Sequence, residues 1–135
     1  MPKFNEARKI ATHLKKFEAE INSMVNTMGV MAKNHFTANF RKQGFEDETV
    51  IPWQPRKKRE RAGRGILIKS GRLRRSISFR KKGKWSVVIG TDVPYAKVHN
   101  EGSRKMPKRQ FIGYSGKLNR QIISSFSSKI KRIFA

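Results

Sequence analysis

The sequence contains no cysteine. This absence excludes disulfide bonds, thiolate zinc sites and a cysteine nucleophile, and it fits a reducing compartment. No apolar run approaches the roughly 20 residues that a membrane span needs. The N-terminal segment, MPKFNEARKIATHLKK, also lacks the apolar centre of a signal peptide. Together these absences predict a soluble protein without membrane contact that is made and kept inside a cell.

Acidic residues are scarce, with 9 Asp and Glu against 32 Lys and Arg, so the formal net charge is +23. So large a charge repels itself and favours polyanions or acidic protein surfaces, and charge alone does not separate these two kinds of partner. The length of 135 residues suits one domain, which we expect over residues 1–135. The hydrophobic share of 36% is below the usual value, which predicts that part of the chain lies outside the core.

Apolar residues recur at steps of three and four from Ala7 to Phe40, which predicts one long helix or two in sequence. Gly29 marks a point where the helix could break or kink. Gly44 is a natural C-terminal stop. A continuous helix of about 30 residues would reach roughly 45 Å, which is long for a compact domain of this size. Its apolar stripe therefore serves either the intramolecular core or a neighbouring subunit.

Residues 45–66 have mixed charges, two prolines and closing glycines, which predicts an exposed basic loop. Trp53 is expected to attach the base of this loop to the core. Basic side chains in and after the loop are candidate contacts to DNA or to an acidic partner, with a solvated loop as the alternative. These candidates are Arg56, Lys57, Lys58, Arg59, Arg61, Arg64, Arg72, Arg74 and Arg75.

The hydrophobic period changes to two after Gly71, where Leu73, Ile77 and Phe79 alternate with polar residues. The turn sequence KKGK and a second alternating stretch follow, so the pattern predicts a β-hairpin. A short extended piece, RQFIGY, precedes an amphipathic helix over residues 118–134. The expected fold class is α+β, with a long N-terminal helix, an antiparallel sheet based on the hairpin, a basic loop and an amphipathic C-terminal helix.

One cluster resembles an active site, because Asp92, Tyr95, His99 and Glu101 lie close together in sequence. With the acidic residues 46–48 it could form a metal nuclease site, but its spacing matches no known metal motif. Structural roles account for the same residues. Asp92 can cap a helical turn that Pro94 begins and Gly102 ends, while Tyr95, Ala96 and Val98 pack. We therefore expect no catalytic residue, no metal site and no cofactor, and we expect His35 to be a hydrogen-bonded core histidine.

Four stretches occur in a characteristic order: NFRKQGF, WQPRKKRERAGRGILIKSGRLRRSI, VVIGTDVPYAKVHNEG and MPKRQFIGYS. In this order they resemble the phage virion morphogenesis family, also called tail-completion or head–tail joining proteins. The resemblance implies a non-enzymatic structural protein of tailed phages or prophages, assembled in the host cytoplasm and located in the virion at the head–tail junction or tail end. It also implies a ring of identical subunits, six by similarity, around the DNA channel. Its neighbours would be head-connector and tail-terminator or tail-tube proteins, with non-specific contact to DNA.

The residues that match the family motifs are candidates for fold and assembly roles. They are Trp53, Pro55, Leu67, Ser70, Gly71, Leu73, Ser76, Ile77, Tyr95, Ala96, His99, Gly102, Pro107, Arg109, Phe111 and Gly113. Lys108 and Gln110 depart from the family pattern, which usually has a small residue and a proline there. Tyr95 and His99 are expected to hold a turn that shapes a surface for a neighbouring subunit. The alternative to a neck protein is a general nucleic-acid-binding protein of packaging or chromatin-like type.

Overall fold

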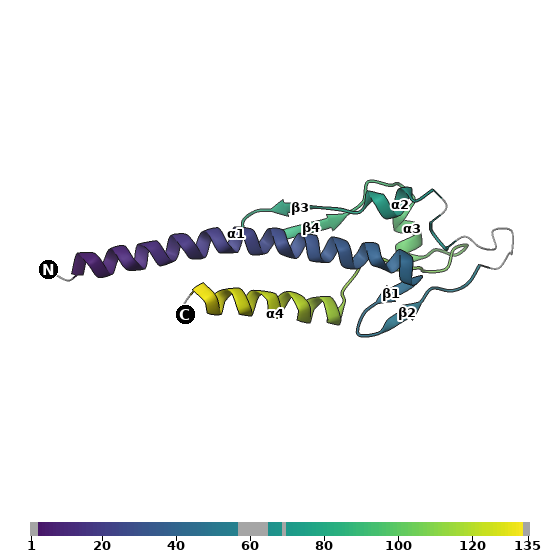
Figure 1. Ribbon diagram of the computed structural model, residues 1–135. Coiled ribbons are helices and arrows are strands. Elements are labelled where there is room, and N and C mark those ends of the chain that lie inside the picture. Colours follow the sequence, from purple (N-terminus) through teal and green to yellow (C-terminus); the bar gives the residue numbers. More distant parts are fainter. Residues whose placement is uncertain (1–2, 57–64, 69, 134–135) are drawn as a thin grey trace.

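The computed structural model describes residues 3–56, 65–68 and 70–133, and it has the expected α+β architecture (Figure 1). One long helix, α1, extends along the molecule, with the hairpin β3–β4 on one side and helix α4 on the other (Figure 1). Two antiparallel two-stranded sheets are present, β1–β2 and β3–β4. The elements in chain order are α1 (Lys3–Lys42), β1 (Gly44–Glu46), β2 (Val50–Pro52), α2 (Arg72–Ser76), β3 (Ser78–Lys82), β4 (Ser86–Gly90), α3 (Ala96–Glu101) and α4 (Gly116–Ile133).

Helix α1 is continuous over 40 residues and therefore spans about 60 Å. Gly29 does not break it; instead, a Cβ atom at Gly29 would collide with the ring of Phe79. The glycine thus lets strand β3 lie directly against the helix. The helix ends at Lys42 and not at Gly44, because Gln43 turns the chain in a left-handed conformation with φ 55°. The Gln43 side-chain amide donates a hydrogen bond of 2.6 Å to the Phe40 carbonyl in the last turn.

The alternating stretch after Gly71 is a short helix followed by a strand, so the prediction of a strand from Leu73 was wrong at its start. Leu73 and Ile77 are both buried, at 3% and 1% exposure. A spacing of four residues places two side chains on the same face of either a helix or a strand. Here the helical arrangement is the one observed, because Leu73 lies in α2 and Ile77 directly follows it. The rest of the predicted hairpin is confirmed, with Lys82 opposite Ser86 and Gly83 in the turn at φ 71°.

The exposed loop expected over residues 45–66 begins differently from the prediction. Strands β1 and β2 form a hairpin there, with Phe45 opposite Ile51, and all three residues of β1 are buried. Trp53 is buried as expected, whereas residues 57–64 lie outside the described part of the chain. The extended piece expected over residues 109–114 forms no strand.

The hydrophobic core lies around the C-terminal half of α1. Phe40 is completely buried and its ring contacts the rings of Trp53 and Phe111, with centroids 5.6 and 5.3 Å away. Helix α4 joins this core through Leu118. By contrast, residues 5–16 of α1 are exposed throughout, and the N-terminal end of the helix extends past the end of α4 (Figure 1).

Candidate assembly site

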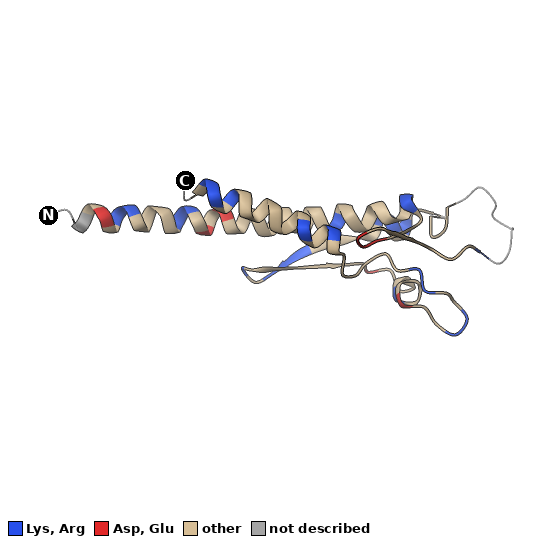
Figure 2. Cartoon of the chain, turned by 90° about the horizontal axis from the view of Figure 1, so that it is seen from below, with Lys and Arg blue, Asp and Glu red and all other residues tan. Residues whose placement is uncertain are grey.

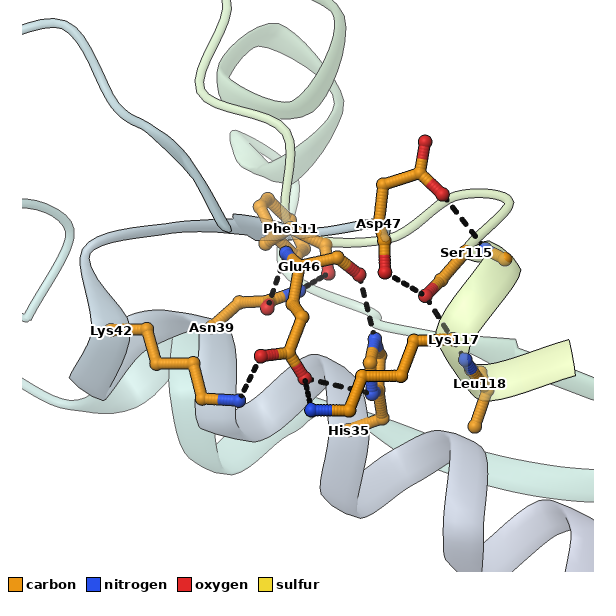
Figure 3. Close-up of polar contacts among 10 residues, drawn as sticks. His35, Asn39, Lys42, Glu46, Asp47, Phe111, Ser115, Lys117 and Leu118 are labelled. Atoms are coloured by element: carbon orange, nitrogen blue, oxygen red, sulfur yellow. Dashed lines mark hydrogen bonds and ion pairs between the residues drawn. The ribbon is translucent and has the colours of Figure 1, made fainter. Parts of the chain in front are cut away.

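A buried amide connects three segments at the C-terminal end of α1 (Figure 3). Asn39 donates a hydrogen bond of 3.0 Å from Nδ2 to the Phe111 carbonyl, and its Oδ1 accepts one of 3.1 Å from the backbone N–H of Glu46. Asn39 is fully buried within the apolar stripe of the helix. A buried polar group is tolerated only when it is hydrogen-bonded, and both partners of Asn39 come from other segments. The sequence analysis assigned no role to Asn39. A polar residue next to the buried positions Phe36 and Phe40 could have indicated a buried hydrogen bond.

Glu46 is the centre of a buried ionic cluster (Figure 3). Its carboxylate contacts Lys42 Nζ at 2.7 Å, Lys117 Nζ at 3.4 Å and His35 Nδ1 at 3.8 Å. The hydrogen bond from Lys42 lowers the pKa of Glu46, burial opposes this shift, and Lys117 lowers the pKa further. His35 Nε2 also lies 2.9 Å from the Glu46 backbone carbonyl, so the expectation of a hydrogen-bonded core histidine is confirmed. This cluster joins α1, β1 and α4.

The start of α4 is fixed by two side chains (Figure 3). Ser115 Oγ accepts a hydrogen bond of 3.2 Å from the Leu118 N–H, which is the usual way for a serine to cap a helix. Asp47 Oδ1 accepts one of 2.8 Å from the Gly116 N–H. Asp47 therefore ties the β1–β2 turn to the first turn of α4, and Glu48 in the same turn pairs with Arg120.

The second and the last of the family-like stretches meet in the core. Trp53 Nε1 donates a hydrogen bond of 2.7 Å to the Gln110 carbonyl. Arg109 is only 7% exposed, its Nε donates to the Gln54 carbonyl at 3.0 Å, and Phe111 is 1% exposed. Pro55 is exposed and Pro107 is half-buried. At Gly113, a Cβ atom would collide with the side chain of Gln110.

The motif around α2 also serves the fold. Leu73 and Ile77 belong to the core, and Gly71 precedes the helix at φ 71°, a conformation that glycine adopts without strain. Ser76 Oγ donates to the Leu73 carbonyl at 2.6 Å. Before α2, Leu67 is half-buried and Ser70 is exposed. Gly71, Leu73, Ser76 and Ile77 therefore shape α2 and attach it to the core.

The turn over residues 93–102 is helical, as expected, but Asp92 does not cap it. Asp92 is exposed, and the first residue before α3, Tyr95, makes no side-chain cap. Thr91 Oγ1 accepts the Val93 N–H at 3.1 Å instead. Of the three residues expected to pack, Ala96 is buried, whereas Tyr95 and Val98 are each 41% exposed. Gly102 ends the helix at φ 79° as predicted.

Tyr95 and His99 form an edge-to-face pair with ring centroids 5.8 Å apart. The guanidinium of Arg72 lies 5.9 Å from the Tyr95 ring centroid, which is within the range of a cation–π contact. Burial lowers the pKa of His99, and the charge of Arg109 lowers it further. Tyr95 is thus a surface residue that contacts the half-buried ring of His99 and the guanidinium of Arg72.

The residues proposed for a metal nuclease do not converge. The acidic residues 46–48 contact basic side chains or the start of α4, as described above. Across residues 3–56, 65–68 and 70–133, no three His, Asp or Glu side chains form a group that could hold a metal ion. No helix within these ranges is long and apolar enough to cross a membrane.

The basic candidate residues fall into two groups. Lys57, Lys58, Arg59, Arg61 and Arg64 lie outside the described residues. On α2, Arg72 and Arg75 are exposed and Arg74 is half-buried, while Arg56 is half-buried and donates a hydrogen bond of 2.8 Å to the Gly65 carbonyl. The strand predicted to carry the α2 arginines is thus a helix, and it presents two of them to solvent.

Exposed apolar side chains follow the N-terminal part of α1. Ile10 is 61% and Leu14 is 58% exposed, and both lie on the stripe that continues into the core. Along residues 5–16, Glu6 is followed only by basic charged residues, and Lys and Arg also gather at the C-terminal end of α4 (Figure 2). An apolar stripe on an overhanging helix is suited to packing against another protein.

Comparison with known proteins extends this description. A model of the phage virion morphogenesis family matches residues 3–131, which is nearly the whole chain. No curated protein and no solved structure matches significantly. The matched range includes the overhanging part of α1 as well as the core motifs.

Proposed function

This chain belongs to the phage virion morphogenesis family, and we propose that it completes the tail of a tailed phage or prophage and joins it to the head. In this proposal it acts as one subunit of a homo-oligomeric ring around the DNA channel, with no enzymatic activity. The observation that carries the proposal is the family match over residues 3–131. The neighbours would be head-connector and tail-terminator or tail-tube proteins, and the site of action would be the head–tail junction or tail end.

The exposed part of α1 supports a role in assembly. Helices in proteins are stabilised mainly by tertiary packing of an apolar face, and residues 5–16 have no such packing within the described chain. Burying Ile10 and Leu14 against a neighbour would contribute roughly 1.5–3 kcal/mol for each side chain. A second subunit in a ring would supply the surface that the isolated chain lacks.

The surplus of 23 positive charges supports a position beside DNA or an acidic ring. Arg72 and Arg75 are exposed on α2 and available for such contacts. Helix α2 is only five residues long, and its arginine side chains are long and flexible, so any DNA contact that they make would be to phosphates.

Inactivating the gene in its phage or prophage tests the proposal. We expect filled heads and complete-length tails that remain separate in electron micrographs, and we expect the intact gene supplied in trans to restore joined particles. Infectious particles with normal necks in the absence of the gene would contradict the proposal. A failure of head formation or of DNA packaging would contradict it as well.

The net charge also favours the second candidate, a general nucleic-acid-binding protein. Duplex DNA binding as a function of salt separates the two functions. Contacts limited to phosphates weaken steeply as salt rises, so a neck protein should bind poorly near physiological salt. Tight binding that persists there, together with normal head–tail joining in the absence of the gene, would favour the second candidate.

A further inference from the structure

The tip of the β3–β4 hairpin carries an exposed tryptophan. Trp85 lies in the turn that joins the two strands and is 66% exposed, whereas Trp53 is 6% exposed and belongs to the core. An indole with most of its surface in water contributes little to the hydrophobic core. The packing of the chain therefore does not account for Trp85, and a contact with another molecule would.

Basic side chains lie next to this tryptophan along the hairpin. Arg80 and Lys82 on β3 and Lys84 in the turn are all exposed (Figure 2). None of the three forms an ion pair with a described acidic side chain. Residues 61–91, which include the whole hairpin, contain no Asp or Glu. The hairpin thus carries charge of one sign and favours an anionic partner.

The hairpin is attached to α1, while its tip stays open. A Cβ atom at Gly29 would collide with the Phe79 ring, so β3 lies directly against the helix, and Lys81 Nζ donates a hydrogen bond of 3.3 Å to the Asn22 carbonyl. At the tip, a Cβ atom at Gly83 would meet nothing within 4 Å. A surface that is already held in place loses less conformational freedom when it binds a ligand.

The strand arranges its cations in a row. Arg80 and Lys82 lie on the same face of β3, because alternate residues of a strand point to the same side. Their Cα atoms are roughly 6.8 Å apart, since an antiparallel strand rises about 3.4 Å per residue. Such a row suits a partner that repeats its negative charge at regular intervals, and a nucleic-acid strand carries one phosphate for each nucleotide.

The indole distinguishes between the possible anionic partners. Aromatic side chains beside cationic ones bind single strands, because bases stack on the aromatic ring while phosphates pair with Lys and Arg. In a duplex the faces of the bases are covered by their stacked neighbours, so a side chain reaches them only after unstacking. An acidic protein surface would balance the charge of the hairpin, but it gives no reason for an exposed indole beside the lysines.

We propose that the tip of the β3–β4 hairpin binds single-stranded DNA, with a base stacked on Trp85 and phosphates on Arg80, Lys82 and Lys84. The site goes beyond the proposed function, which requires only contacts from α2 to phosphates. The choice of DNA over RNA rests on the proposed function, because a position at the DNA channel is what would bring DNA to the hairpin.

Titration of the purified full-length protein with a thymidine oligonucleotide of about 15 nucleotides, below physiological salt, tests the stacking contact. We expect tryptophan emission to be quenched on binding, and we expect Trp85→Ala to abolish the quenching and weaken the affinity about tenfold. Tyr114→Ala is the matched control, because it removes another exposed aromatic side chain, 75% exposed and directly before α4. It should change the affinity less than about twofold.

The phosphate contacts are tested by the salt dependence of the same binding. Lys82→Gln should lower the slope of log affinity against log salt by about 0.7, the value for one phosphate contact on a single strand. Lys131→Gln removes the same charge from an exposed position on α4, on the other side of α1 from the hairpin, and should leave the slope unchanged (Figure 1).

Three outcomes would overturn the proposal. The first is equal losses of affinity in Trp85→Ala and Tyr114→Ala. The second is a duplex of the same length that binds as tightly as the single strand, since the contact would then be to phosphates alone. The third is a polyglutamate peptide that displaces the oligonucleotide and quenches Trp85 equally, which would indicate an acidic protein as the partner. These outcomes leave the proposed function intact, because head–tail joining is measured separately in phage that lack the gene.

Discussion

Asn39 donates a hydrogen bond of 3.0 Å to the backbone carbonyl of Phe111, a residue 72 positions further along the chain. The same side chain accepts the Glu46 N–H through its Oδ1 at 3.1 Å, so one buried amide joins α1 to β1 and to the segment before α4. Apolar packing alone would allow these segments to slide against the helix. Paired hydrogen bonds in a dry environment select one arrangement.

Replacing Asn39 should therefore be severe. Asn39→Leu removes the partners of two buried backbone groups, each of which costs about 1–3 kcal/mol when unsatisfied. We expect a loss of about 2–4 kcal/mol in the free energy of unfolding, measured by urea denaturation and circular dichroism. Asn26→Leu, at an exposed position of the same helix, should change stability by about 0.5 kcal/mol or less. Similar losses in both variants would contradict the role assigned to Asn39.

Glu46 should make the stability depend on acidity. Lys42 and Lys117 hold the pKa of the folded-state carboxylate below its ordinary value of 4.5. A lowered folded-state pKa means that the stabilisation is present above the unfolded-state value and is lost as pH falls through the folded-state pKa. We expect the free energy of unfolding of the wild type to fall more steeply between about pH 6 and pH 3 than that of Glu46→Gln.

The control for this titration is Glu101→Gln, which removes an exposed carboxylate on α3. It should retain the acid dependence of the wild type, whereas Glu46→Gln should be less stable near neutral pH by roughly 1–3 kcal/mol. Parallel pH profiles of the wild type and Glu46→Gln would show that the ionic cluster contributes nothing to acid stability.

Replacing Gly29 with alanine should destabilise the fold, although alanine has the higher helix propensity. Alanine is about 1 kcal/mol better than glycine in a helix interior, but its methyl group would collide with the Phe79 ring. Overpacking of this kind typically costs 1–3 kcal/mol, so we expect Gly29→Ala to be destabilising overall in thermal and urea unfolding.

A double-mutant cycle isolates the collision. In a Phe79→Ala background the ring is absent, so Gly29→Ala should be neutral or stabilising there. The same loss in both backgrounds would show that the contact between β3 and α1 is not the cause.

The exposed stripe of α1 should matter for assembly more than for folding. Leu14→Glu changes a residue that is 58% exposed, so we expect the free energy of unfolding of the isolated chain to change by about 0.5 kcal/mol or less. Self-association should weaken, measured by analytical ultracentrifugation over a range of protein concentrations. Thr12→Glu introduces the same charge about 200° around the helix and should leave self-association unchanged. Equal effects of the two variants would argue against the stripe as the contact.

Much of the local structure could be predicted from sequence. The three- and four-residue spacing of apolar side chains predicts α1 and α4, and the KKGK turn predicts the β3–β4 hairpin, because these features depend on neighbours within a few residues. The predicted start of the hairpin, which included Leu73 and Ile77, was wrong because the spacing of these two residues fits a helix and a strand equally. The β1–β2 hairpin was missed because Phe45 and Trp53 are buried by residues distant in sequence.

By itself, the sequence determined the α+β class, the long helix, the excess of positive charge and the family motifs, all of which follow from composition and local periodicity. Only the tertiary structure decided what the motif residues do. It buries Arg109 and leaves Tyr95 at the surface. It also assigns structural roles to Asn39, which begins the first family-like stretch but had no role of its own, and to Glu46, which had been considered only for a metal site. The physical reason is that a hydrogen bond or an ion pair depends on which groups folding brings within about 3–4 Å, and these partners lie far apart along the chain.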